Sequence, residues 1–249
     1  MSASLQPVYE PHAFLAQMDR NALPILLICA GSMLANYTLF IESFRVSRRL
    51  KMVTMPVFCT LFWLVHDASY VVQYDKWFNG YDHWYTKLFW VALVLTVAWE
   101  LAFTAQILAY GREEFAPFLS QRQWVGAVFG AVVLSGGTWA VLKAYIADDL
   151  YVWTFGVALI AYPIFGLFTM AKRRSVRGFT PLQPAALTVM CLTWFTASIG
   201  WFGPEFRTWQ WVVLAVLSTG SAAFMTWIAV RFREPAEAAT SREAVAASA

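Results

Sequence analysis

Charged residues are scarce in this chain of 249 residues: Asp, Glu, Lys and Arg make up 13% of it, against roughly 25% in an average soluble domain. Hydrophobic residues make up 59%. So little of the chain suits a water-exposed surface that we expect most of it to lie in a lipid bilayer. The net charge of +3 comes from short basic turns, which favour contact with anionic lipid headgroups over nucleic acid.

Cysteine and histidine are also scarce, with three of each. The cysteines fall inside predicted membrane spans and lack the spacing of metal ligands or of a disulfide framework; they are Cys29, Cys59 and Cys191. Three histidines are too few for a membrane di-iron oxidase. The last apolar stretch, Trp209 to Val230, contains no lysine, which excludes a retinal Schiff base.

One pair of adjacent acids, Asp148 and Asp149, invites comparison with a magnesium-diphosphate site. The pair continues as Leu150-Tyr151-Val152, without a third acid, and falls in a short predicted loop. This argues against metal-dependent prenyl transfer. We therefore expect neither a metal nor an organic cofactor.

Long apolar stretches dominate the rest of the sequence, and a spanning helix needs about 20 mostly apolar residues. The sequence predicts seven such spans, near 22–44, 52–73, 85–110, 123–146, 152–171, 183–203 and 208–230. We thus expect an all-α protein whose seven-helix transmembrane bundle occupies residues 22–233. Residues 1–21 are predicted to form an extracytoplasmic or interfacial segment, and the small, polar residues 234–249 a disordered tail.

Basic residues collect in alternate connections between the spans. They are Arg45, Arg48, Arg49 and Lys51, then Lys172, Arg173, Arg174 and Arg177, and finally Arg231 and Arg233. The remaining connections are acidic or neutral. Because cytoplasmic loops of membrane proteins are enriched in Lys and Arg, the pattern predicts an outside N-terminus and a cytoplasmic C-terminus.

Two acids lie deep inside predicted spans: Asp67, next to His66 in the second, and Glu100 in the third. An acid at this depth costs several kcal/mol unless it is paired, neutralised or facing a cavity, so each is a candidate functional residue. Helical spacing puts Trp63 and Tyr70 on the same stripe as Asp67. The alternative is that both acids only bond neighbouring helices together. At their depths the two acids could flank one elongated apolar ligand.

Four of the 13 tryptophans fall deep within spans, whereas others lie near span ends as an aromatic belt. The deep ones are Trp63, Trp99, Trp139 and Trp194. Indole faces can stabilise a cation by about 2 kcal/mol when desolvated, so these residues are candidates for lining a pocket. Plain packing is the alternative.

Several stretches together resemble a known family. The run Leu34 to Ile41, the basic turn and the run Met55 to Trp63 resemble the small integral-membrane terpene cyclases of fungal meroterpenoid and indole-diterpene pathways and their bacterial relatives, which act on prenylated indoles. The similarity continues through Phe89-Trp90 and the segment from Thr104 to Glu114, and more loosely around Trp201 to Glu205. It spans most of the chain in order, without a single specific motif.

The resemblance implies a membrane-bound enzyme that protonates an alkene or epoxide on a prenyl chain and closes rings through carbocations. In that family a glutamate directly after the helix-two tryptophan and an aspartate in helix seven are held to start the reaction. Here Leu64 follows Trp63, and Thr219 stands near the second position. We therefore predict Asp67 as the proton donor and Glu100 as the second carboxyl.

The residues predicted to bind the substrate are Trp63, His66, Tyr70, Trp99, Asn36, Tyr37, Phe103 and Trp194. The expected partners are a lipophilic prenylated substrate and membrane lipid, in a bacterial plasma membrane or a fungal endoplasmic reticulum. The alternative function is a seven-helix transporter or receptor for a small molecule, in which the two acids bind the solute or relay protons. The segment Lys172 to Pro181 resembles a loop that such transporters need twice, but it occurs once.

Overall fold

The computed structural model describes residues 9–233, and this part of the chain is helical without a β-strand. The helices are α1 (Pro11–Arg20), α2 (Ala22–Leu50), α3 (Val57–Val71), α4 (Trp84–Phe115), α5 (Gln121–Tyr145), α6 (Val152–Ala158), α7 (Ala161–Arg173), α8 (Leu182–Ala197) and α9 (Trp209–Arg231). Short π- or 3-10-helical segments occupy Lys76–Gly80, Ser198–Phe202 and Pro204–Arg207.

Six helical segments within residues 9–233 are long and apolar enough to cross a membrane. They are Ala22–Leu50, Trp84–Phe115, Gln121–Tyr145, Val152–Arg173, Leu182–Phe202 and Trp209–Arg231. Residues 9–233 are therefore all-helical, and their long apolar helices indicate a multi-pass membrane protein. Predicted tail residues 234–249 lie outside the described residues.

The predicted span 52–73 differs from the structure in length. Helix α3 covers 15 residues, short of the roughly 20 that a straight span needs. It begins only after Pro56, and its regular hydrogen bonding stops at Val72, before the π-helical segment Lys76–Gly80. Hydropathy averaged over a window cannot detect such breaks, so the count of seven spans stays a prediction.

The predicted span 152–171 is present but broken into α6 and α7. Pro163 stands in the first turn of α7, where its missing N–H costs no hydrogen bond. The break allows close packing: a Cβ atom on Gly156 of α6 would overlap the indole of Trp211 on α9. A larger residue there would push α6 away from α9.

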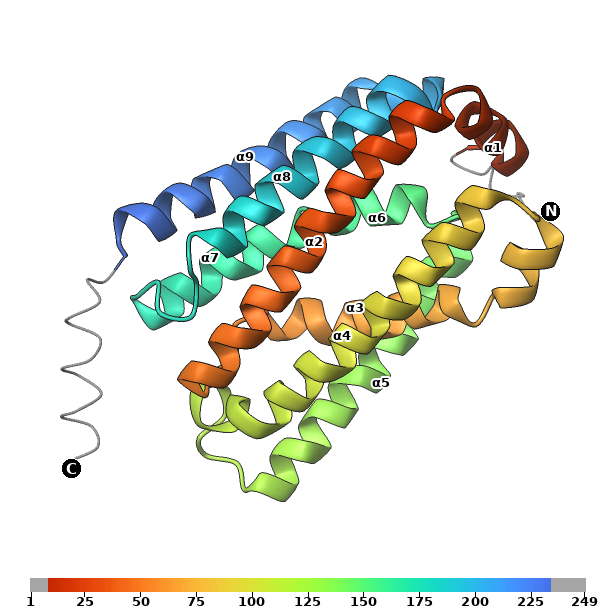
Figure 1. The fold of residues 1–249 in the computed structure, drawn as a ribbon. Helices are drawn as coiled ribbons and strands as arrows, with labels where there is room; N and C mark the ends of the chain where they lie inside the picture. The colour runs from red at the N-terminus through yellow and green to blue at the C-terminus, as the bar shows by residue number, and fades with distance from the viewer. Residues whose placement is uncertain (1–8, 234–249) are drawn as a thin grey trace.

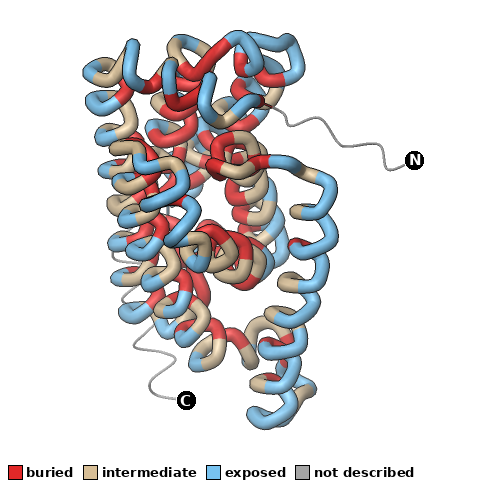
Figure 2. Tube along the Cα trace, turned by 90° about the vertical axis from the view of Figure 1, so that its right-hand side faces the viewer, coloured by how far each residue is buried: buried red, intermediate tan, exposed pale blue. Residues whose placement is uncertain are grey.

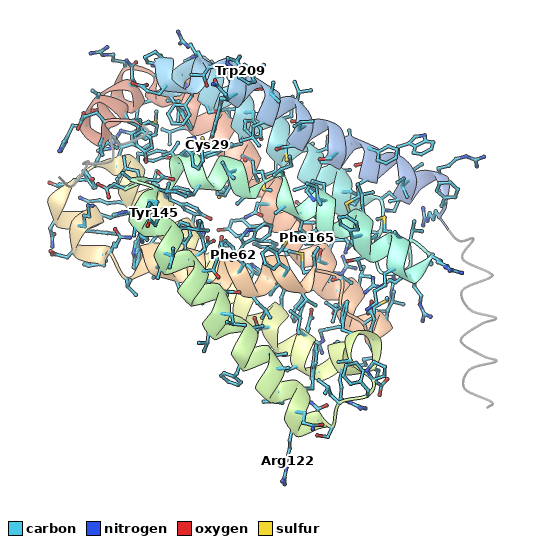
Figure 3. The ribbon with its side chains drawn as sticks, turned by 180° about the vertical axis from the view of Figure 1, so that it is seen from behind. Cys29, Phe62, Arg122, Tyr145, Phe165 and Trp209 are labelled. Carbon is cyan, nitrogen blue, oxygen red and sulfur yellow. The ribbon has the colours of Figure 1, made fainter. Side chains whose placement is uncertain are left out.

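The helices form two groups with α6 and α7 between them. Helices α2, α8 and α9 lie side by side, and α3, α4 and α5 form the second group (Figure 1). Buried residues follow the inside of this arrangement, and exposed residues cover its periphery (Figure 2). Phe165 of α7 contacts the second group, with its ring centre 4.8 Å from that of Phe58 on α3 (Figure 3).

The two ends of the bundle differ in chemistry. At one end Arg173 of α7 bonds the carboxylate of Glu114 at 2.7 and 2.8 Å, and Phe232 lines a surface hollow together with Arg174. Arg122 projects from the tip of α5 in Figure 3. At the opposite end, residues 9–20 pack on the bundle through the buried side chains of Phe14 and Met18. The predicted interfacial segment is therefore helical over Pro11–Arg20.

Candidate functional site

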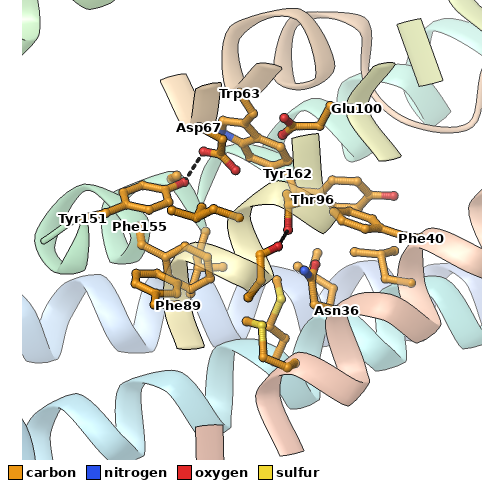
Figure 4. Close-up of a pocket in the computed structure, with 18 residues that line it drawn as sticks. Asn36, Phe40, Trp63, Asp67, Phe89, Thr96, Glu100, Tyr151, Phe155 and Tyr162 are labelled. Carbon is orange, nitrogen blue, oxygen red and sulfur yellow. Dashed lines mark hydrogen bonds between the residues drawn. The ribbon is translucent and has the colours of Figure 1, made fainter. Parts of the chain in front are cut away.

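A cavity lies in the middle of the bundle, between the two groups of helices. Figure 4 draws the 18 residues that line it, which come from α2, α3, α4, α7, α8 and the segment that begins at Tyr151. Both acids singled out in the sequence, Asp67 and Glu100, are among them. We call this space the central cavity.

Asp67 lies on α3 with 4% of its surface exposed. Its Oδ1 atom accepts a hydrogen bond from the hydroxyl of Tyr151 at 2.5 Å and lies 2.7 Å from Nδ1 of His66. The His66 ring in turn packs edge-on against Trp139, with ring centres 4.2 Å apart. Two polar partners thus hold the Asp67 carboxyl in one orientation, with its Oδ1 atom as the shared acceptor.

Tyr151 reaches Asp67 because the chain turns sharply before α6. Its φ of +61° places it in the left-handed region, which costs a residue with a Cβ atom on the order of 1–3 kcal/mol. Neighbouring Asp148 fixes the turn, since its carboxylate accepts hydrogen bonds from the backbone N–H groups of Val152 at 3.0 Å and Thr154 at 2.6 Å. Tyr70 also donates to the Asp148 carbonyl at 2.9 Å.

Glu100 lies on α4 with 2% of its surface exposed, and neither of its carboxyl oxygens has a hydrogen-bond partner among the described residues. Burying an ionised carboxylate without a donor or a cation costs far more than burying a neutral carboxylic acid. The surroundings of Glu100 therefore favour the form that carries a proton. Figure 4 shows Asp67, Trp63 and Glu100 along the same side of the central cavity.

Aromatic rings make up much of the remaining wall. They are Phe40, Trp63, Phe89, Tyr151, Phe155 and Tyr162. Trp63 and Tyr162 stack with ring centres 6.4 Å apart, and Phe89 stacks on Tyr151 at 5.6 Å. Each ring face attracts a desolvated cation by about 2 kcal/mol, so this wall can stabilise a positive charge in the absence of water.

The structure brings some of the predicted site residues to the central cavity and places others behind its wall. Besides the two acids, Trp63 and Asn36 line the cavity. His66 contacts Asp67, and Tyr70 stacks on Tyr151 with ring centres 4.6 Å apart. The four remaining predicted residues also lie outside the lining of the central cavity. Tyr37 donates a hydrogen bond to the Ala92 carbonyl at 3.3 Å, and Trp99 and Phe103 pack on Phe40. Trp194 lines a neighbouring pocket.

Sequence reasoning missed Tyr151, although this residue makes the shortest polar contact to Asp67. It stands in a predicted loop, two residues after Asp149, where helical spacing carries no information. Its partner lies 84 residues earlier in the chain, so only the tertiary structure joins them. Phe40, Phe155 and Tyr162 were missed because aromatic residues are common in every span.

Comparisons with known proteins leave the site to be interpreted from its geometry. No protein-family model matches this chain, and no curated protein and no solved structure matches it either. Within residues 9–233, no three His, Cys, Asp or Glu side chains gather in a way that could hold a metal ion. The arrangement comprises one carboxyl without a partner, one carboxyl held by a tyrosine and a histidine, and an aromatic wall.

Proposed function

We propose that this chain is a membrane-bound terpene cyclase, which closes rings on the prenyl chain of a lipophilic substrate such as a prenylated aromatic or indole compound. The observation that carries the proposal is the pairing of two buried carboxyls in different environments on one aromatic-lined cavity. Acid-initiated cyclisation requires a proton-bearing carboxyl, a proton acceptor and a dry wall that stabilises carbocations. The resemblance seen in the sequence points to the same chemistry.

Glu100 is the proton donor in this proposal, because its surroundings favour the neutral acid. Its proton adds to the terminal alkene or epoxide of the prenyl chain and leaves a carbocation. The next double bond attacks that cation and forms the ring C–C bond. This proposal exchanges the roles predicted from the sequence, where Asp67 was the donor.

Asp67 is the terminal base. The last carbocation loses a proton to its carboxylate, which leaves a new double bond in the product. One proton is added and one is removed, so the product is an isomer of the substrate. Tyr151 and His66 orient the Asp67 carboxylate at 2.5 and 2.7 Å. Between turnovers Asp67 releases its proton to solvent and Glu100 takes up a proton from solvent, which resets the enzyme.

The same proposal includes seven membrane crossings, with the N-terminus outside and the C-terminus in the cytoplasm. Helix α3 and the helical segment that follows it to Gly80 make the crossing that α3 alone is too short to complete. The gathering of Arg173, Arg174 and the end of α9 at one end of the bundle supports a cytoplasmic position for that end.

The test is product formation by purified protein in lipid nanodiscs given farnesylated and geranylgeranylated aromatics. Replacing Glu100 with Gln removes the proton but keeps the size, so turnover should fall by about two to four orders of magnitude. Glu113→Gln is the matched control, because Glu113 lies on the same helix with 87% of its side chain exposed. That variant should keep wild-type turnover.

Asp67→Asn should retain substrate protonation and change where the last proton is lost, which alters the mixture of double-bond isomers. An active Glu100→Gln beside an inactive Asp67→Asn would return the donor role to Asp67. Two fully active variants would remove both acids from the chemistry. Transport of a small polar solute into proteoliposomes, without any ring-closed product, would contradict the cyclase and support a transporter.

A further inference from the structure

A second pocket adjoins the central cavity between α2 and α4. Three residues line both spaces: Met33, Phe89 and Ala92. Leu26 and Leu88 form its rim and are 41% and 56% exposed, so the pocket opens on the apolar periphery of the bundle. We call this space the side pocket.

A polar group inside the side pocket has no partner. Tyr85 of α4 lines the pocket with 6% of its surface exposed, and its hydroxyl has no hydrogen-bond partner among the described residues. The Cys29 thiol of α2, on the opposite wall, is close enough to interact with this hydroxyl electrostatically. A buried hydroxyl without a partner is unfavourable, whereas a ligand oxygen or nitrogen in the pocket would satisfy it.

The two spaces together extend along α4. Tyr85 precedes Glu100 by fifteen residues on the same helix, a distance of about 22 Å at 1.5 Å per residue. A molecule with a polar group at Tyr85 and a reactive carbon at Glu100 needs an extended apolar chain between them. At the outer end, the indole of Trp84 donates to Asp19 at 2.8 Å and marks the level of the membrane interface.

We propose that the side pocket is the head-group site of the substrate and its entrance from the bilayer. The ligand class is an aromatic head with a hydrogen-bonding atom, attached to a prenyl chain of several isoprene units. The head binds at Tyr85, and the chain passes Ala92 so that its far end lies between Asp67 and Glu100. This inference rests on the proposed function.

The test uses a ligand that cannot react: a farnesyl-indole analogue with a fully saturated chain and a diazirine on the indole ring. Photolabelling of wild-type protein in nanodiscs should modify peptides that contain residues 25–33 and 84–92. Excess unlabelled saturated farnesyl-indole should abolish the labelling, whereas the same saturated chain without a head should not. Labelling elsewhere, or equal competition by the headless chain, as expected for a bilayer acyl chain, would overturn the inference.

Two substitutions sharpen the result. Ala92→Leu fills the junction of the two spaces and should lower labelling at least tenfold. Ala98→Leu adds the same side chain to an exposed position of α4 and should leave labelling unchanged. Tyr85→Phe should raise the concentration for half-maximal labelling by about fivefold, the worth of one neutral hydrogen bond. Equal labelling of the Ala92 and Ala98 variants would contradict the proposed path.

The experiment separates the head-group site from the proposed chemistry. Labelling of the side pocket, in a protein that forms no ring-closed product from any unsaturated analogue, would support the site and overturn the cyclase. Product formation by a protein that is labelled elsewhere would support the cyclase and overturn the site.

Discussion

Replacing Asp148 tests how the fold positions the site. Its side chain is 3% exposed. One carboxylate oxygen accepts the hydroxyl of Tyr9 and the N–H of Val152, and the other accepts the N–H and hydroxyl of Thr154 at 2.6 and 2.7 Å. Asp148→Asn replaces one acceptor oxygen with a donor NH₂ group. The hydroxyl on that side can turn and accept a hydrogen bond from the NH₂ group, but the backbone N–H loses its acceptor.

The size of the effect follows from these contacts. Hydrogen bonds to a charged group are worth about 1.5–3 kcal/mol each, so the loss of one costs about 1.5–3 kcal/mol. For a chain of this length that corresponds to a fall in the unfolding temperature of roughly 3–12 °C. Because Asp148 also fixes the turn that carries Tyr151 to Asp67, turnover measured below the unfolding temperature should fall as well.

The control is the adjacent residue. Asp149 is 46% exposed and pairs with Lys76 at 2.7 Å, and exposed ion pairs of this kind contribute about 0–1 kcal/mol. Thermal unfolding in one detergent, followed by tryptophan fluorescence at a fixed scan rate, compares Asp148→Asn with Asp149→Asn. Equal shifts for the two variants would refute the structural role assigned to Asp148.

Two further predictions concern packing and topology. Gly156→Ala would force a methyl group into the indole of Trp211 and should destabilise the protein by about 1–3 kcal/mol. Gly130→Ala is the control, because open space surrounds that position and no destabilisation is expected. Thermal unfolding of the two variants checks this, and a stable Gly156→Ala would contradict the tight packing of α6 on α9. Epitope tags added before residue 5 and after residue 240 should be cleaved by protease from opposite membrane faces, outside and cytoplasmic respectively. Cleavage of both tags from one face would mean an even number of crossings.

Much of the helical architecture could be predicted from the sequence, because a long apolar run has few alternatives to a helix in lipid. Helices α2, α4, α5 and α9 occupy the predicted spans, with boundaries that differ by a few residues. The shortness of α3 and the break between α6 and α7 could not be predicted. Both depend on where the hydrogen-bonding pattern stops, which average hydropathy does not reveal.

The site was predictable only where a residue type was rare. Acids are uncommon in membrane spans, so Asp67 and Glu100 stood out, and both line the central cavity. Their catalytic roles remain predictions. Tyr151 could not be predicted, because its contact with Asp67 joins a loop to a distant helix. The different surroundings of the two acids could not be predicted either, because the contacts of Asp67 with His66 and Tyr151 form only in the folded protein.

In the proposed reaction, a carboxyl of this chain adds a solvent-exchangeable proton to a prenyl chain, which then closes a ring. The most direct measurement is mass spectrometry of products formed in D₂O by wild-type protein and by Glu100→Gln from farnesylated and geranylgeranylated aromatics. We predict a ring-closed isomer that carries one deuterium from the wild type, and at least a hundredfold less of it from the variant. Ring-closed product without deuterium, or equal deuterated product from both proteins, would contradict the account.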